Sequence, residues 1–141
     1  MIRLVIDTDV MAAALESATG ASRRVLVHVL QGEIELLLST ALMLEYEAVL
    51  TRPEVLQRSG LAVAEILAIL DELALLCVPV AFDYRWRPVA ADQDDDFVVE
   101  TAINGAADII ASFNVRDMAE GAARFGITIE RPAEISRRFR R

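Results

Sequence analysis

The chain has 141 residues and a formal net charge of −8, and 55% of its residues are apolar. This length suits one domain with a real core, and the apolar fraction excludes a disordered chain. All 14 basic residues are Arg, which excludes mechanisms that need a Lys ammonium, while one His and one Cys are too few for a structural zinc site or a disulfide framework.

The hydrophobic pattern predicts strands that alternate with helices. An apolar run at residues 2–6 fits a buried parallel strand that ends at Asp7. The expected elements that follow are, in chain order, helices at 11–15 and 23–30, a strand at 34–38, a helix at 41–50, a short helix that starts at Pro53 and ends by residue 60, a helix at 64–76, a strand at 78–82, a loop at 83–93, a helix at 97–104, a strand at 108–111, a helix at 115–125 and a strand at 127–129. This order predicts an α/β fold, a three-layer sandwich with a mostly parallel central sheet, in a single domain of residues 1–141 with a basic tail at 131–141.

Polar residues follow the predicted strands at their carboxyl ends, where parallel sheets bind ligands. They are Asp7, Thr8 and Asp9 after the first strand, Ser39 and Thr40 after the second, and Ser112 and Asn114 after the fourth. We expect these side chains to lie at one edge of the sheet.

Asp7 and one of two glutamates are the first candidates for a pair of functional acids. Asp7 stands where a buried strand gives way to a loop, a position that is also common for a helix cap. Glu45 and Glu47 lie on opposite rims of the apolar stripe of the helix at 41–50, and periodicity does not choose between them. Either glutamate also fits an ordinary solvated flank.

A second group of acids lies in the run at 92–96, directly before a predicted helix. Asp94 and Asp95 bracket the inner face of that helix, so at least one acid is expected to face the sheet. Acids in a first helical turn also stabilise the helix dipole without any further role. Asp117 stands three residues after Asn114, a spacing close to a capping box and compatible with a functional acid.

These acids belong to segments that are far apart in the sequence, and the predicted fold brings the segments together at one end of one sheet. About 5 Å apart, at an effective dielectric constant of about 20, two carboxylates repel each other by roughly 3 kcal/mol, so such a cluster needs a cation or protons. Oxygen ligands without His or Cys select a hard ion, Mg²⁺ or Mn²⁺. Acid clusters that hold such ions typically serve phosphoryl transfer or phosphodiester hydrolysis.

Four stretches of the sequence carry a resemblance to a known family. They are VIDTDVMAAAL, LSTALMLEYEAVLTRP, DQDDDFVVETAINGAADIIASFNVRDM and ITIERPAEI. With these motifs the chain resembles the PIN-domain ribonucleases, especially the VapC-like toxins of toxin–antitoxin pairs. The resemblance implies that the catalytic acids, which also hold the metal, are Asp7, Glu45 and Asp95. The Ser-x5-Glu-Tyr motif of that family selects Glu45 over Glu47.

The chain departs from the family pattern at two positions. Asp9 stands where the family usually has Asn, which adds negative charge near the metal. Asn114 stands where the family has the acid of a Thr-x-Asp motif, and Asp117 is the nearest replacement as a fourth metal ligand. The side chains expected to orient ligands or phosphate by hydrogen bonds are Thr8, Ser39 and Asn114.

The resemblance implies a cytoplasmic endoribonuclease that depends on Mg²⁺ or Mn²⁺ and acts as a toxin, with an RNA substrate, a small antitoxin as partner and a homodimeric state. Five Arg residues in the last 11 positions fit phosphate binding, a solvated tail or an antitoxin-docking element equally well. Apolar surface at 61–76 and 25–30 exceeds what one small sheet covers, and it fits a dimer face and an antitoxin groove. The N-terminal sequence suits no signal peptide, and acids interrupt the longest apolar segment, so we expect no membrane association.

The sequence is also compatible with two other functions. A PIN-like domain with a weakened acid set would bind RNA or protein without catalysis, and the amide at Asn114 favours this alternative. The Asp7-Thr8-Asp9 sequence also resembles the start of haloacid-dehalogenase phosphatases. Those enzymes normally need a later Lys and a cap domain, and a chain of 141 residues without Lys fits them poorly.

Overall fold

The computed structural model describes residues 1–82 and 95–139, except for the side chains of Asp95, Asp96, Asp117, Met118 and Glu120. Within these residues the centre of the protein is a five-stranded sheet in the order β3-β2-β1-β4-β5, and every neighbouring pair is parallel. The strands are β1 (Arg3–Ile6), β2 (Glu35–Ser39), β3 (Val78–Val80), β4 (Ile109–Ala111) and β5 (Thr128–Glu130). The predicted α/β fold is confirmed, and the sheet is parallel throughout.

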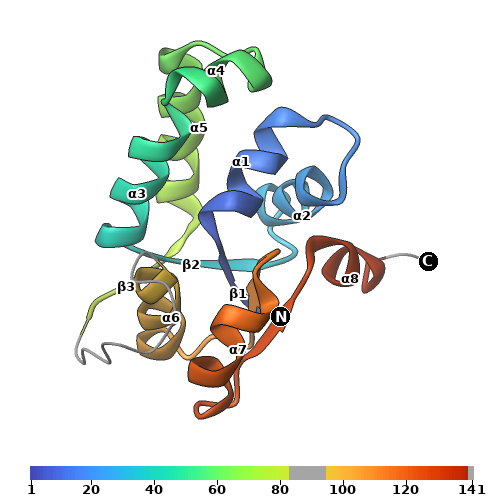
Figure 1. Ribbon diagram of the computed structural model, residues 1–141, viewed down its shortest axis with the longest axis vertical. Coiled ribbons are helices and arrows are strands. Elements are labelled where there is room, and N and C mark those ends of the chain that lie inside the picture. The colour runs from blue at the N-terminus through green and yellow to red at the C-terminus, as the bar shows by residue number, and fades with distance from the viewer. Residues whose placement is uncertain (83–94, 140–141) are drawn as a thin grey trace.

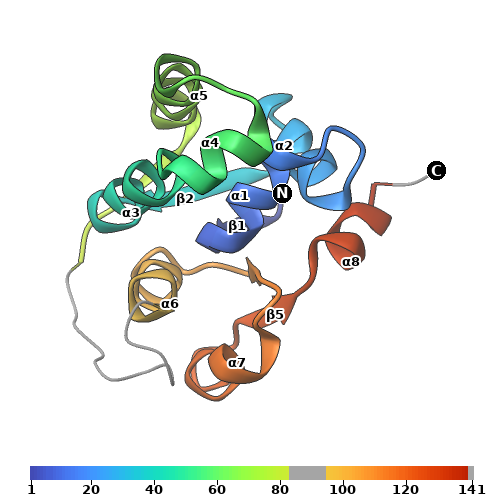
Figure 2. The same ribbon diagram turned by 45° about the horizontal axis from the view of Figure 1, so that its top comes forward.

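Helices cover both faces of the sheet, which gives the three predicted layers (Figures 1 and 2). One face carries α1 (Thr8–Glu16), α2 (Ala21–Leu30), α3 (Thr40–Leu50), α4 (Pro53–Ser59) and α5 (Val63–Leu76). The other face carries α6 (Asp95–Asn104) and α7 (Val115–Ala123). The final helix, α8 (Pro132–Arg137), follows β5 and packs against α2.

The central strands are apolar without interruption because helices bury both of their faces. In β1 and β2 the side chains of Leu4, Val5 and Leu37 are completely buried. The helix α6 lies especially close to the sheet at Gly105. A Cβ atom added there would lie 2.9 Å from Val80 Cγ2 and 3.0 Å from Leu37 Cδ1, so only Gly fits at this contact.

The strand register brings the carboxyl ends of the central strands together. Ile6 pairs with Ala111, and the N–H of Asp7 donates to the backbone O of Ala111 over 2.9 Å. Ser39 ends β2, which lies on the other side of β1. The residues that follow three adjacent strands therefore lie at one edge of the sheet, as the sequence predicts.

The opposite, amino-terminal end of the sheet carries a network around Arg3. The Arg3 guanidinium donates to Glu35 Oε2 over 3.0 Å and to the backbone O of Gly105 over 2.7 Å. The backbone N–H of Arg3 donates to Asp108 Oδ2 over 2.9 Å. Two acids at this end are thus bonded to Arg3, and its guanidinium also caps the carboxyl end of α6.

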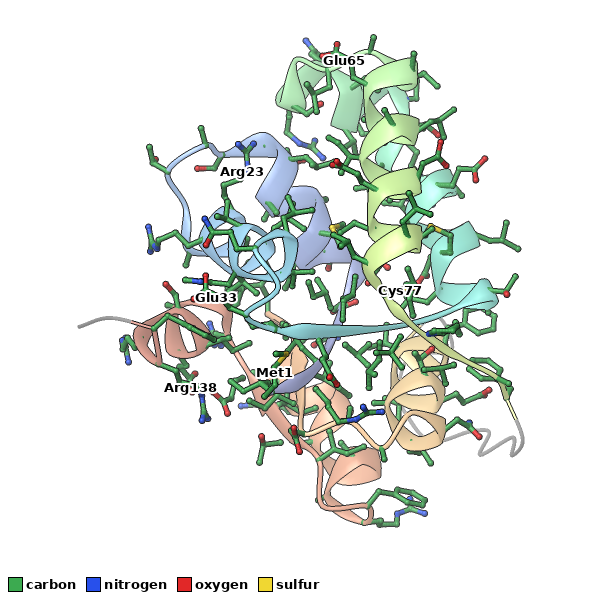
Figure 3. The ribbon with its side chains drawn as sticks, turned by 180° about the vertical axis from the view of Figure 1, so that it is seen from behind. Met1, Arg23, Glu33, Glu65, Cys77 and Arg138 are labelled. Atoms are coloured by element: carbon green, nitrogen blue, oxygen red, sulfur yellow. The ribbon has the colours of Figure 1, made fainter. Side chains whose placement is uncertain are left out.

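Part of the predicted basic tail is folded. Pro132 lies in the first turn of α8, and Ile135 is completely buried. Against α8, the His28 ring of α2 stacks on Phe139 with ring centroids 4.2 Å apart, and His28 Nδ1 lies 3.2 Å from Glu33 Oε1. Figure 3 shows Glu33 beside these two helices. The Arg-rich composition of the segment hid this helix, because polar and charged residues separate the apolar residues that anchor it, Ile135 and Phe139.

Two further expectations concern the middle of the chain. The strand expected at 78–82 is shorter and covers Val78–Val80, and the loop expected at 83–93 lies outside the described residues. In the described ranges, no helix has both the length and the apolar character that crossing a bilayer requires.

Candidate active site

Asp7 stands at the carboxyl end of β1, where the chain turns into α1. The residue is 5% exposed, and Ser112 Oγ donates to Asp7 Oδ2 over 2.8 Å. Ser112 is completely buried and accepts the backbone N–H of Asn114 over 2.9 Å. Because a hydroxyl has a single proton, the Asn114 amide leaves the Ser112 proton for Asp7. Asp7 occupies the N-cap position of α1, but its side chain makes no capping hydrogen bond within the described structure.

Burial raises the pKa of Asp7 from 3.8 to about 6. The hydrogen bond from Ser112 lowers this pKa, whereas the negative charges of Asp9 and Glu45 raise it. A cation beside a buried carboxylate favours its ionised form and so reverses the effect of burial. The surroundings of Asp7 therefore favour a bound cation at neutral pH.

Glu45 reaches the same place from α3. Thr8 Oγ1 donates to Glu45 Oε2 over 2.9 Å, so this acid lies beside the residue that follows Asp7. Glu45 is half-buried, whereas Glu47 is exposed. The structure thus distinguishes two glutamates that the helical pattern leaves equivalent.

Tyr46, which lies between the two glutamates, explains this difference. Its side chain is completely buried, and its hydroxyl donates to the backbone O of Ile6 at the end of β1. Successive side chains of a helix are turned by about 100°, so fixing Tyr46 inward sends its two neighbours to opposite sides. Burial, followed by the charges of Asp7 and Glu45, raises the pKa of Tyr46 well above its ordinary value, and the phenol stays protonated.

Ser39 connects β2 with α3 and α6. Its Oγ atom accepts the backbone N–H of Leu42 over 3.2 Å, which confirms the predicted N-cap of the helix. The same atom lies 2.7 Å from Thr101 Oγ1 on α6. At 4% exposure, Ser39 is buried between these elements.

The remaining predicted acids are placed by their backbones. Asp95 is the first residue of α6 and Asp117 lies in α7, and both side chains are outside the described part of the structure. The Gly105 carbonyl, after the end of α6, is bonded to Arg3 at the start of β1, whereas Thr101, one turn earlier, lies beside Ser39 at the end of β2. The helix therefore runs with its start toward the carboxyl end of the sheet. Asn114 occupies the N-cap position of α7, but in the described structure its side chain does not form the predicted cap.

Three buried side chains of this region are missing from the sequence prediction, and a fourth, Ser112, was expected at this edge of the sheet without a role in the site. Ser112 follows β4 directly, and Thr101 is polar on an otherwise apolar helix face, so both had a signal in the sequence. Tyr46 reads as an ordinary core residue. Glu100 of α6 is completely buried although it lies off the predicted inner face of its helix.

The described side chains form an incomplete metal-binding set. Among them, no group of three or more His, Cys, Asp or Glu residues is arranged to hold a metal ion. Asp7 and Glu45 contribute two carboxylates with neighbouring hydroxyls, a donor set made of oxygen alone. This chemistry fits a hard divalent cation and not a soft one.

The family model for the PIN domain matches residues 3–116. The chain belongs to the PIN-domain family. The match covers Asp7, Glu45 and Asp95, and Asp117 lies just beyond it. Among curated proteins, none matches the chain significantly.

PIN domains are typically nucleases, and they typically bind divalent metal ions such as Mg²⁺ or Mn²⁺. The geometry agrees with this general chemistry. The carboxyl edge of the parallel sheet carries a buried acid of raised pKa, and a second acid is hydrogen-bonded beside it. Membership of this family leaves the phosphatase alternative without support.

Proposed function

We propose that this PIN domain is an endoribonuclease that depends on Mg²⁺ or Mn²⁺ and acts as the toxin of a toxin–antitoxin pair. The observation that carries the catalytic part is the buried Asp7 carboxylate at the end of β1. Its pKa is raised to about 6, and a second acid, Glu45, acts on it from α3. Such a pair is stable in its ionised form when a cation lies beside it.

The residues that would hold the metal are Asp7 and Glu45, with Asp95 and Asp117 as the further predicted ligands. When bound, Mg²⁺ or Mn²⁺ supplies an activated water and offsets the charge that develops on the phosphate. Asp95 starts α6, whose amino end lies toward the same edge of the sheet, which supports its place in the set.

Hydrogen bonds within the chain prepare the first two acids. Ser112 donates to one oxygen of Asp7, and Thr8 donates to one oxygen of Glu45. These bonds orient the carboxylates before a ligand arrives, and such partners commonly change metal affinity by about 10- to 100-fold. They support the predicted orienting role of Thr8. Asn114 has an indirect role, because its backbone N–H donates a hydrogen bond to Ser112 Oγ.

Two Arg residues at the ends of α8, the N-cap Arg131 and Arg137 in the last turn, support a nucleic-acid substrate despite the net charge of −8. Arg131 and Arg137 are exposed, and Arg131 follows the carboxyl end of β5, on the same edge of the sheet as Asp7. Arg contacts to phosphate position a nucleic acid without reading its sequence. This arrangement supports an RNA backbone that runs along the edge toward the acids.

Exposed apolar side chains support the proposed antitoxin and the homodimer. Leu44 of α3 is 59% exposed, and Leu75 and Leu76 at the end of α5 are 87% and 51% exposed. A pocket of about 230 Å³ lies between these helices, near Cys77 at the junction of α5 and β3 (Figure 3). A second surface on α2 exposes Val27 and Leu30. These two surfaces would supply the dimer face and the groove for an amphipathic antitoxin helix.

A catalytically weak binding module is the second candidate. The position of the usual fourth acid holds Asn114, which removes one negative charge from the metal set. Such a domain would keep the RNA- or protein-binding surface and lose turnover.

Cleavage of a single-stranded RNA by the purified protein tests the catalytic proposal. We expect cleavage in Mn²⁺ or Mg²⁺, none with a chelator, and loss of activity in Asp7→Asn. Asp71→Asn, the same change at an exposed position of α5, is the matched control and should cleave like the parent. Equal cleavage by the parent and Asp7→Asn contradicts the assignment, and no cleavage in any metal favours the binding module.

The toxin role has a separate test in cells. We expect expression of the chain alone to arrest growth, and Asp7→Asn to relieve the arrest. Unaffected growth together with metal-dependent RNA cleavage in vitro would retain the nuclease and remove the toxin.

A further inference from the structure

A chain of hydrogen bonds joins α3 to α6 through two hydroxyls. The Leu42 N–H donates to Ser39 Oγ over 3.2 Å, and Ser39 Oγ lies 2.7 Å from Thr101 Oγ1. Thr101 Oγ1 donates to the backbone O of Phe97 over 2.6 Å. A carbonyl oxygen only accepts, so the single proton of Thr101 is used there. Ser39 must therefore donate its own proton to Thr101, and the chain has one direction.

Both hydroxyls are removed from solvent. Ser39 is 4% exposed and Thr101 is completely buried. A buried hydroxyl that loses its hydrogen-bond partner costs free energy, so breaking this pair is unfavourable for either member. Thr101 is moreover polar on a face of α6 that also buries Val98 and Ala102.

The hydroxyl pair is one of the contacts that hold α6 against the sheet. Another is Gly105, where an added Cβ would lie 2.9 Å from Val80 Cγ2. The contact at Gly105 sets how closely the helix approaches β2 and β3. The bond between Ser39 and Thr101 sets its position along and around its axis. Both contacts restrain the position of α6, and the hydroxyl pair is the one nearer to its first turn.

The chain of hydrogen bonds ends in the two helices that carry predicted acids. Its acceptor end, the Phe97 carbonyl, is two residues after Asp95. Its donor end, the Leu42 amide, is three residues before Glu45. Two helices on opposite faces of the sheet are thus joined close to the residues that the proposed site needs.

We infer that Thr101, acting through Ser39, is a positioning residue for the acid site. It holds the first turn of α6, where Asp95 stands, at a fixed place relative to the Asp7–Glu45 pair. This inference rests on the proposed metal-dependent function. The sequence predicts that Ser39 orients ligands or phosphate by hydrogen bonds, and this inference assigns it the positioning of α6 instead.

Mn²⁺ binding to the RNA-free protein, measured by calorimetry, tests the inference without relying on activity. Thr101→Val keeps the side-chain shape and removes the hydroxyl, and we expect its dissociation constant for Mn²⁺ to rise about 10-fold. Thr101→Ser restores the hydroxyl and should bind Mn²⁺ like the parent. Ser39→Ala breaks the same link and should match Thr101→Val, and the double variant should be no weaker than either single one.

Thr51→Val is the matched control, because Thr51 Oγ1 also donates to the carbonyl four residues earlier, that of Glu47, over 2.7 Å. We expect its Mn²⁺ affinity to equal that of the parent. If Thr101→Val melts at a lower temperature but binds Mn²⁺ like the parent, the pair only stabilises the fold and the inference is overturned. Should Thr101→Val fail to fold, Ser39→Ala decides in the same way.

Asp7→Asn separates this inference from the proposed function. If Asp7→Asn loses Mn²⁺ while Thr101→Val and Ser39→Ala retain it, the proposed function stands and this inference alone fails. If the parent and Asp7→Asn bind Mn²⁺ equally, the proposed function fails and the inference falls with it.

Discussion

The two ends of the central sheet differ in whether a positively charged side chain is bonded to an acid. At the amino end, Glu35 accepts a hydrogen bond from the Arg3 guanidinium, whereas Asp108 accepts one from the backbone N–H of Arg3. At the carboxyl end, Asp7 and Glu45 are bonded to neutral hydroxyls. A guanidinium neutralises a carboxylate as well as orienting it, whereas a hydroxyl only orients it.

This difference separates a structural network from a site prepared for a ligand. Around Asp7, burial raises the pKa to about 6, and the charges of Asp9 and Glu45 raise it as well. Burial and negative neighbours make the ionised carboxylate unfavourable in the metal-free fold. A cation bound from solution would do at the carboxyl end what Arg3 does at the amino end.

The largest effect is expected from the glutamates of α3. Glu45→Gln removes one charge from the proposed metal set, and we expect RNA cleavage in Mn²⁺ to fall roughly 1,000-fold. Glu47→Gln, two residues away on the exposed side, should leave the rate unchanged. Initial rates at saturating Mn²⁺ measure both. Equal losses in the two variants would break the distinction that the Tyr46 anchor makes between them.

The second effect concerns the pH dependence that Asp7 gives to the free energy of unfolding of the metal-free protein. Its pKa is about 6 in the folded protein and near 3.8 when unfolded, so between these pH values the folded state binds more protons. Its free energy of unfolding therefore falls as pH rises through this range, by roughly 3 kcal/mol. Asp7→Asn does not titrate, so in chelator it should be more stable than the parent at pH 7.5, with the difference vanishing below pH 4.

Urea unfolding at several pH values measures this effect. Saturating Mn²⁺ should reverse the order at pH 7.5, because metal binding stabilises the folded parent and not Asp7→Asn. A parent more stable than Asp7→Asn in chelator at neutral pH would contradict the pKa assignment.

A third, smaller effect is expected when an acid is added to or removed from the carboxyl end, because the affinity for Mn²⁺ should change. Asn114→Asp places an acid beside the Ser112–Asp7 bond, and we expect Mn²⁺ affinity to rise about 10-fold. Asp117→Asn should weaken it by a similar factor if Asp117 serves as the fourth ligand. Calorimetric titration alongside thermal melting decides this. If Asp117 only supports the helix, its loss lowers stability by about 1 kcal/mol and leaves Mn²⁺ affinity unchanged.

The smallest effect is expected at the amino end. Arg3→Gln breaks a pair in which the Arg3 and Glu35 side chains are 36% and 38% exposed, so solvent screening keeps the loss of stability near 1 kcal/mol. Mn²⁺ affinity should stay at the parent value. A marked loss of Mn²⁺ affinity in Arg3→Gln would show that the amino end also controls the site.

Much of the fold follows from local sequence patterns. The buried run of β1, the Ser39 cap and the helix start at Pro53 are readable because strand periodicity, helix caps and turn residues involve near neighbours in the chain. The helix α8 was not predicted, because it is stabilised by packing against α2 and not by its own composition. Placing Asp7 at the end of a buried strand also needs only local information.

The sequence by itself therefore determined the order of the elements up to β5, the α/β class with a mostly parallel sheet and the position of Asp7. Only the tertiary structure decided which partners the acids have. It places Glu45 beside Thr8 because Tyr46 is bonded to Ile6 across the α3–β1 contact. The bonds from Ser112 to Asp7 and between Ser39 and Thr101 join residues 105 and 62 positions apart. No local pattern encodes such pairs, because strand order and helix packing bring them together only when the whole sheet has formed.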